Sequence, residues 1–549
     1  MIITKGATAD GSMVVTHSDD DELADQRVIR VPAADHAPGS RRPVMAESYP
    51  YPRMVTTGRG RGYDTPGWPQ TEPVGDIPQA LHTSAYFDGN YGIVNEHNLM
   101  MGECTNGARY EPRPVTVQEA AETGRHVRLF YSSELSRVAL ERCQTARGAI
   151  HLMGDLIDEY GYYSTGETLL VADEDEAWVF EMCALPSETH HSAWVAQQVP
   201  DGEAFVAANE FRIREVPSRR YEQIHSETLC ETLQAVDWWN PAHGRLDWLR
   251  AVSPGEYGHP YYSLRRVWRI LDRINPDLGL SPWVQDGYTA AYPFSIVPHH
   301  KLGLEEVFGL YRDHYEGTQF DLTKGAAAGP YGDPNRFAGR YDGNQNDVTT
   351  GLTAYGAWER PISVFYQGYT YVLSARPHVA EPARGLMWFA PDISYTSVFT
   401  PFYTRCAELP WSYQSGDPRC LDRTSAWWAF DFVANWARLN FQRMTQADIL
   451  PLQAQNEAEA RAAVAAVDAQ VRDDPERAVA IMTEFGMERA ADLLDAWWSL
   501  ADRLVAKYSD GYINPPPLVR AAPSPVGYPA TWLAATDYVN GPVSYAMKG

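Results

Sequence analysis

Near the start of the chain, the residues best suited to chemistry form the run His17-Ser18-Asp19-Asp20-Asp21. They follow the apolar residues 13–15, which are typical of a short strand. A carboxylate held at the end of a strand can orient an amine or a catalytic base, and this spacing permits that chemistry. A bare acidic run is more often a solvated turn. The spacing alone leaves both interpretations open.

Six cysteines are the other candidate reactive groups, and they are widely scattered. They are Cys104, Cys143, Cys183, Cys230, Cys406 and Cys420. No two of them form a C-x-x-C pair, and no histidine cluster stands at the spacing of a zinc site. The run DGNQND at 342–347 lacks the glycine and the final glutamate of a calcium loop. We therefore expect reduced, mostly buried thiols and no metal.

Composition excludes several kinds of partner. The 549 residues include 71 Asp and Glu against 46 Lys and Arg, a formal charge of −25 that argues against nucleic acid and anionic membranes. The most apolar run, SAWWAFDFVANWARL, is interrupted by charged and polar residues and is shorter than the roughly 20 apolar residues of a membrane span. We expect a cytoplasmic protein that binds neither nucleic acid nor membrane.

Strands must position the acidic run. Residues 2–3 and 13–15 flank GATADGS, whose Gly, Asp and Ser residues are typical of a turn, so a β-hairpin is predicted at the start of the chain. The blocks GIVNEHNLMMGECTNG and TLLVADEDEAWVFEMC predict further strand pairs. SSELSRVALERCQTARGAIHLMGDLIDEYG has the apolar spacing of helices.

The second half of the chain changes in character. ISVFYQGYTYVLSA, GLMWFAPD and TSVFTPFY predict strands, whereas residues from about 426 to 508 have the pattern of amphipathic helices. An α/β layered core followed by a helical segment is therefore expected.

Eight blocks, collinear over about residues 2–440, carry a family resemblance. They are TKGATADGSMVVTHSDD, VNEHNLMMGECT, LFYSSELSRVALERCQTARGAI, YGYYSTGETLLVADEDEAWVFEM, VAANEFRIREV, PYYSLRRVWRIL, LYRDHYEGTQFDLTKGAAAGPYGDPNR and DRTSAWWAFDFVANWA. Together they resemble the PepD-type cysteine dipeptidases, relatives of secernin among the N-terminal-nucleophile hydrolases. The resemblance implies a four-layer αββα sandwich. It divides the chain into a peptidase domain at 1–425, a helical extension at 426–515 and an irregular tail at 516–549.

The nucleophile is where this sequence departs from the family. The resemblance implies a mature chain that begins with a cysteine, whose own α-amine serves as the base for its thiol. Aligning Lys5, Ala7 and residues 10–12 with the family pattern places that cysteine about three positions before Met1. We expect the chain as given to be inactive. A start assigned a few residues late is the favoured explanation, ahead of an artefact of expression or processing and of an inactive homologue.

Cys104 is the best internal thiol, but no terminal amine accompanies it. Its block falls where the resemblance implies a strand of the substrate pocket. We therefore interpret Cys104 as a pocket-lining or core residue.

The resemblance also implies roles near the nucleophile. Asp20 matches the aspartate that holds the terminal amine, and His17 stands where the wider superfamily has an arginine. Asn95 matches the asparagine whose amide helps to form the oxyanion hole. An ordinary turn residue is the alternative interpretation of Asn95.

Two later residues complete this set. Asn209 matches a second polar group that orients the amine, and Arg266 matches the arginine that polarises the surroundings of the cysteine, with Arg265 as the neighbouring alternative. A strand-end cap and a surface cation are the ordinary interpretations of Asn209 and Arg266.

The function implied by the resemblance is that of a broad-specificity dipeptidase acting through a thioester. Its substrate would be a short peptide with a free amino group, and a carboxylate such as Asp20 or Glu103 would hold charge in the pocket. No metal or organic cofactor is expected, and a homo-oligomer remains open. An acylase on the same fold and a non-catalytic peptide-binding homologue are the alternatives.

Overall fold

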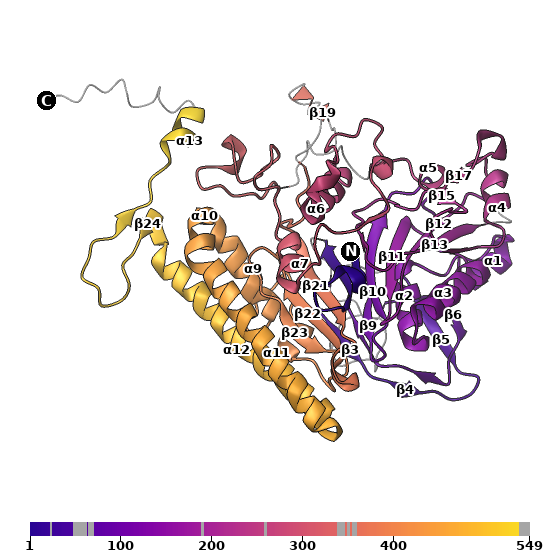
Figure 1. Cartoon of the computed structure of the whole chain (residues 1–549), viewed down its shortest axis with the longest axis horizontal. Coiled ribbons are helices and arrows are strands. Elements are labelled where there is room, and N and C mark those ends of the chain that lie inside the picture. The colour runs from indigo at the N-terminus through magenta and orange to yellow at the C-terminus, as the bar shows by residue number, and fades with distance from the viewer. Residues whose placement is uncertain are drawn as a thin grey trace.

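The computed structural model describes most of the chain. The described residues are 1–21, 25–47, 63, 71–187, 191–256, 261–337, 346–347, 352–353 and 359–536. Residues 342–345 of the DGNQND run lie outside them. Two antiparallel sheets form the centre of the molecule, and helices pack against them (Figure 1).

The first sheet has the N-terminal hairpin in its interior. In spatial order its strands are β18 (Ser295–Ile296), β14 (Ala204–Phe205), β1 (Ile2–Ile3), β2 (Met13–Asp20), β21 (Gln367–Ala375), β22 (Gly385–Pro391) and β23 (Thr400–Tyr403). The predicted hairpin is confirmed, because Ile2 pairs with Val15 and Ile3 with Val14. Its turn needs glycine, because Gly11 has a φ of +78°. The two strands of this hairpin are therefore central strands of the sheet.

The second sheet contains the other predicted hairpins. In spatial order its strands are β16 (Gln223–His225), β13 (Ser192–Gln198), β12 (Ala177–Ala184), β11 (Gly166–Ala172), β10 (Met100–Asn106), β9 (Gly92–Asn95), β8 (Tyr86–Asp88) and β3 (Ile29–Val31). The pairing of β9 with β10 and of β11 with β12 confirms the two strand pairs expected from the sequence.

The two sheets share one apolar core. Met13 and Leu373 of the first sheet and Met100, Leu170 and Val179 of the second belong to this buried cluster. Burial of such side chains contributes roughly 25 cal/mol per Å² of apolar surface removed from water, so it holds the sheets face to face.

A glycine sets how closely the sheets approach near the ends of β2 and β10. A Cβ atom on Gly102 of β10 would lie 3.2 Å from the carbonyl oxygen of Thr16 on β2. Such a contact is tighter than most Cβ contacts, so glycine suits this close approach of the two backbones. As a result, the residues after Gly102 lie beside the acidic end of β2.

Helices cover the outer face of each sheet. Helices α2 (Ser132–Arg142) and α3 (Ala146–Tyr160) share a buried cluster with β11 and β12. Helices α11 (Leu450–Asp473) and α12 (Ala478–Lys507) share another with β22. With α9 (Ala426–Ala437), they confirm the helical segment expected after residue 426.

The remaining elements are shorter. The helices are α1 (Val117–Thr123), α4 (Leu229–Ala235), α5 (Trp248–Val252), α6 (Leu264–Ile274), α7 (Leu304–Tyr311), α8 (Trp411–Gln414), α10 (Phe441–Met444) and α13 (Ala530–Ala535). The small strand pairs are β4 (Ala34–Asp35) with β7 (His82–Thr83), β5 (Arg41–Met45) with β6 (Pro73–Pro78), β15 (Glu215–Val216) with β17 (Leu246–Asp247), β19 (Asn346–Asp347) with β20 (Leu352–Thr353), and β24 (Tyr512–Ile513) with β25 (Ser524–Pro525).

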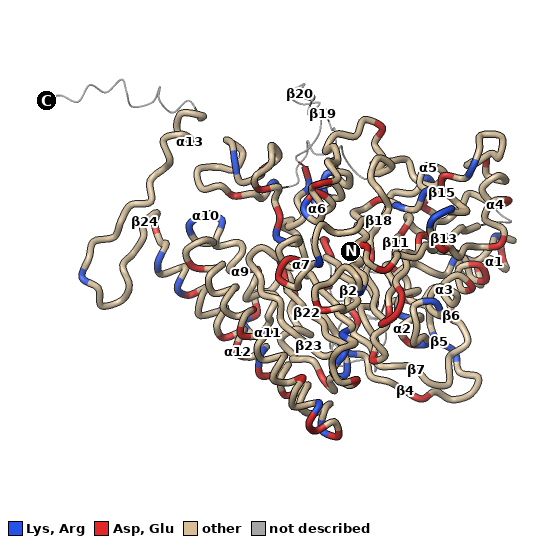
Figure 2. The backbone as a smooth tube through the Cα atoms, in the orientation of Figure 1, with Lys and Arg blue, Asp and Glu red and all other residues tan. Residues whose placement is uncertain are grey.

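Charged residues are distributed over many elements, and acidic and basic positions are interspersed along α11 and α12 (Figure 2). Within the described residues, every helix is too short or too polar to cross a membrane.

Candidate active site

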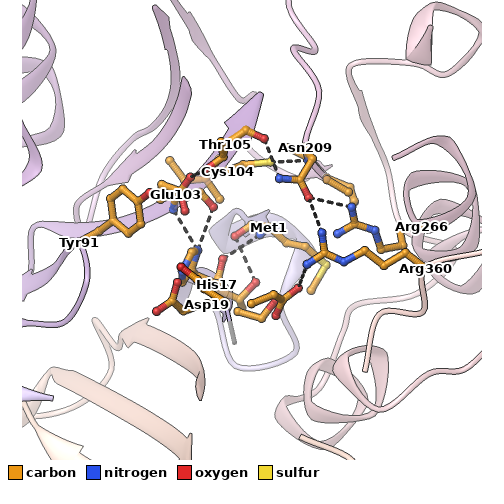
Figure 3. Close-up of a pocket in the computed structure, with 18 of the residues that line it drawn as sticks. Met1, His17, Asp19, Tyr91, Glu103, Cys104, Thr105, Asn209, Arg266 and Arg360 are labelled. Atoms are coloured by element: carbon orange, nitrogen blue, oxygen red, sulfur yellow. Dashed lines mark hydrogen bonds and ion pairs between the residues drawn. The ribbon is translucent and has the colours of Figure 1, made fainter. Parts of the chain in front are cut away.

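A cavity of about 460 Å³ lies where β1 begins and where β2 and β10 end. Its lining includes Met1, just before β1, and Asp20, at the end of β2. It also includes side chains from distant parts of the sequence (Figure 3). Among the lining residues are Met1, His17, Asp19, Asp20, Glu103, Cys104, Thr105, Asn209, Arg266 and Arg360. The cavity therefore brings together His17, Asp20, Asn209 and Arg266, four of the five predicted site residues.

The amine of Met1 is buried at the cavity. It donates a hydrogen bond of 2.9 Å to the carbonyl oxygen of Thr16, and burial lowers its pKa to about 5. An amine in this position is neutral near pH 7 and can accept a proton. The N-terminal end of β1 thus lies at the cavity.

Asp19 and Asp20 are not part of a solvated turn. Both belong to β2, and Asp19 is only 6% exposed. Asn90 donates a hydrogen bond of 2.5 Å to Asp19. Burial, together with the neighbouring carboxylate of Glu103, raises the pKa of Asp19 well above its usual value. The alternative interpretation of this run as a solvated turn is therefore wrong for Asp19.

His17 does not supply the positive charge of an arginine. Its Nδ1 atom lies 2.8 Å from the carbonyl oxygen of Glu103, and burial lowers the pKa of the ring to about 4. The imidazole is consequently neutral at neutral pH. Its Nε2 atom is buried and has no hydrogen-bond partner in the described part of the chain.

Asp20 and Asn209 are joined through Arg360. The Arg360 guanidinium lies 2.7 Å from Asp20, and it also donates to the Asn209 side-chain oxygen at 3.3 Å. Arg266 donates to that same oxygen at 2.8 Å, and the Asn209 amide nitrogen donates to the Thr105 carbonyl at 2.7 Å. Asn209 is therefore fixed between two cationic side chains.

Sequence reasoning missed Arg360. It stands in the segment WERP, which matches no motif of a functional site. It is separated from Asp20 by 340 positions. No sequence signal links the two residues.

Arg266 faces the cavity, whereas Arg265 points into an aromatic cage. The Arg265 guanidinium lies 4.2 Å from the Tyr261 ring centroid and 4.8 Å from that of Trp283. It also donates to the Pro282 carbonyl oxygen at 2.6 Å. These contacts favour Arg266 over its neighbour as the site residue.

Asn95 lies outside the cavity lining, and its side chain is fully used elsewhere. Its amide nitrogen donates to the carbonyl oxygens of Leu140 and Cys143, at 2.9 and 2.8 Å. Its side-chain oxygen accepts the main-chain N–H groups of His97 and Leu99. Because both amide hydrogens are engaged, Asn95 has none left for an oxyanion. The structure places it as a turn residue between β9 and β10.

Cys104 lines the cavity as a protonated thiol. Burial and the adjacent Glu103 carboxylate raise its pKa to about 12. Its sulfur accepts the main-chain N–H of Asn209 at 2.8 Å. A thiol in this state is a weak nucleophile, since the thiolate is the reactive form.

We expect iodoacetamide at pH 7.5 to alkylate the exposed Cys420 at least about 10²-fold faster than Cys104, because the raised pKa leaves so little thiolate at Cys104. Peptide mass spectrometry over a time course measures both rates in one sample. Unfolding in urea should make the two rates similar. Equal rates in the folded protein would contradict the protonated state of Cys104.

Comparison with known proteins identifies the family to which this chain is similar. The profile of peptidase family C69 matches residues 1–450. A probable dipeptidase from Latilactobacillus sakei is 23% identical over 509 residues, covering 92% of this chain and 94% of that protein. A probable dipeptidase from Salmonella dublin is 25% identical over 426 residues, covering 76% and 82%. A dipeptidase from Bifidobacterium longum (strain NCC 2705) is 24% identical over 316 residues, covering 54% and 52%.

Proposed function

Because the chain belongs to peptidase family C69, the PepD-type cysteine dipeptidases, we propose that it binds dipeptides in the cavity beside β1 and hydrolyses their peptide bond. The observation that carries the proposal is the hydrogen-bonded, largely buried array of Asp20, Arg360, Asn209 and Arg266 in the cavity beside Met1. Such an array offers fixed charges and hydrogen bonds for an amine, a thiolate and a peptide carbonyl.

A cysteine thiolate on the main chain that leads into β1 is the nucleophile in this proposal. The register supports its place: Ile2 pairs with Val15, and Met1 exchanges hydrogen bonds with Thr16. Continuing this register, a residue three positions before Met1 would face Asp19 and lie next to Asp20. The 549-residue polypeptide itself carries no thiol at that point and is expected to be inactive.

The reaction has two stages. The thiolate sulfur attacks the peptide carbonyl carbon, and the amine of the second residue leaves with a proton taken from the nucleophile's own ammonium group. Water then attacks the thioester, which releases the first amino acid and restores the thiol.

The site residues have separate tasks in this scheme. Asp20, oriented by Arg360, holds the nucleophile's amine. Asn209 accepts hydrogen bonds from Arg266 and Arg360 and so fixes the positions of the two guanidinium groups. The Arg266 guanidinium stabilises negative charge on sulfur. His17 is neutral and contributes hydrogen bonding rather than charge.

The fold proposal is the αββα sandwich of N-terminal-nucleophile hydrolases. It is supported by two face-to-face sheets with α2 and α3 beyond one and α11 and α12 beyond the other. We keep residues 1–425 as the catalytic domain and 426–515 as a helical extension, since α9 begins at Ala426.

A substrate panel tests the proposal. The chain preceded by Cys-Thr-Thr, with the initiator methionine removed, is incubated with dipeptides and with N-acylated amines, and the products are quantified by mass spectrometry. We expect amino acids to be released from the dipeptides. Cleavage of the acylated amines alone would instead assign an acylase, and no cleavage of either class would contradict an amide hydrolase.

A further inference from the structure

One wall of the cavity contains carboxyl groups without cationic partners. Asp19, Glu103 and Glu167 have other carboxyl groups among their neighbours, and in the described residues no Lys or Arg lies within 4.0 Å of them. Glu103 opens to the cavity, and Glu167 lies behind it with no exposed surface. Buried carboxylates are ordinarily paired, so this wall is complementary to a cationic ligand.

Glu103 and Glu167 are neighbours that differ in acidity. Burial raises the pKa of both carboxyl groups, and the charge of Glu103 raises the pKa of Glu167 further. The Tyr131 hydroxyl donates to Glu167, and the Thr105 hydroxyl donates to Glu103 at 2.8 Å. The pKa of Glu167 is raised well above its usual value, so Glu167 is the member of the pair that holds a proton more readily. Glu103 is the carboxyl group of the pair that faces the cavity.

A second, independent feature lies on the same wall. His17 is 4% exposed, lines the cavity and has no partner for Nε2 in the described part of the chain. Its Nδ1 atom lies closer to the Glu103 carbonyl oxygen, at 2.8 Å, than to the Glu103 nitrogen, at 3.2 Å. Because the carbonyl oxygen can only accept, its shorter contact assigns the hydrogen to Nδ1 in preference to the 3.2 Å contact with the Glu103 N–H, and Nε2 is left as an unused buried acceptor. Figure 3 shows His17 between Glu103 and Asp19.

We propose that Glu103, supported by Glu167 and with His17 Nε2 beside it, is the subsite for the α-ammonium group of the dipeptide. This inference rests on the proposed function and specifies how the cavity recognises its substrate. An ammonium group has three N–H donors, and it can donate them to the Glu103 carboxylate and to His17 Nε2. Arg266 and Arg360 line the opposite side and repel an ammonium group, so the N-terminal residue of the substrate lies toward β10.

An ammonium group fits this wall better than a metal ion does. Among the described residues, no group of three His, Cys, Asp or Glu side chains converges in a way that would hold a metal. Glu103 is the one carboxyl group of the pair that faces the cavity, which matches one ammonium group.

Direct binding to the full chain tests the subsite. Isothermal titration calorimetry compares Ala-Ala with lactoyl-alanine, in which a hydroxyl replaces the ammonium group. We expect lactoyl-alanine to bind about 10- to 100-fold more weakly, the range for a hydrogen bond to a charged group. If the chain cleaves these ligands, the ratio of kcat/KM replaces the ratio of Kd.

Three variants locate the charge. Glu103→Gln should reduce the preference for Ala-Ala to less than about 3-fold, because the remaining partners are neutral. Glu167→Gln should keep the preference, since the Glu103 carboxylate still faces the cavity. Glu111→Gln, which removes an exposed carboxylate at the cavity, is the matched control and should keep the preference as well. Thermal unfolding confirms that each variant is folded.

The outcomes separate the two proposals. Equal binding of the two ligands to the unmodified chain would overturn the ammonium subsite while leaving dipeptide binding intact. Loss of the preference in Glu167→Gln but not in Glu103→Gln would also overturn it. Failure of Ala-Ala to bind at all would contradict the proposed function and the subsite together.

Discussion

The 549-residue chain should release no alanine from Ala-Ala, whereas the chain preceded by Cys-Thr-Thr should release it at least about 10³-fold faster than background, because removing a covalent nucleophile typically costs that much or more. The added cysteine would extend β1 in register with β2 and reach Asp20. Amino-acid release measured by liquid chromatography and mass spectrometry gives the rate.

Two matched controls isolate the nucleophile. An Ala-Thr-Thr extension keeps the added length without the thiol, and a Gly-Cys-Thr-Thr extension keeps the thiol but moves the free amine away from the cysteine. Both should be inactive. Activity of the unextended chain that disappears in Cys104→Ala would contradict this assignment and identify Cys104 as the nucleophile.

The second large effect concerns the ion pair between Arg360 and Asp20. Both side chains are buried, at 6% and 8% exposure. Arg360→Met should lower the free energy of unfolding by about 3–5 kcal/mol, because a buried carboxylate loses its cationic partner. Urea unfolding followed by tryptophan fluorescence measures the change.

A more exposed pair provides the control for this prediction. Arg384 lies 2.8 Å from Glu174, with exposures of 32% and 25%. Arg384→Met should therefore cost no more than about 1 kcal/mol. Asp20→Asn combined with Arg360→Met should recover part of the loss, since no buried charge then remains unpaired. Similar effects of the Arg360 and Arg384 substitutions would show that burial does not set the strength of the Asp20 pair.

Local sequence features predict much of the fold. The Asp-Gly-Ser turn and the apolar runs beside it predict the N-terminal hairpin, since turn geometry and strand periodicity are properties of neighbouring residues. The helical segment after residue 426 follows from its apolar spacing in the same way. The order of the strands in each sheet is not a local property, and no run of residues indicates that β2 lies between β1 and β21.

The sequence also predicts only part of the site. The sequence indicates Asp20, Asn209 and Arg266 through their blocks, and the cavity contains all three. Asn95 has a comparable block, yet its amide is consumed by carbonyl groups of α2 and the turn that follows it. Matching a motif identifies a residue type at a position. It does not say which hydrogen bonds that residue has left to give.

By itself, the sequence determined the family blocks, the elements that carry them and the acidic end of β2, because these depend on neighbouring residues. Only the tertiary structure decided that Arg360 pairs with Asp20, that His17 is neutral and that Glu103 and Glu167 are buried as neighbours. Charge states and ion pairs depend on which distant side chains pack around a group and exclude water from it. That environment exists only once the two sheets have packed together.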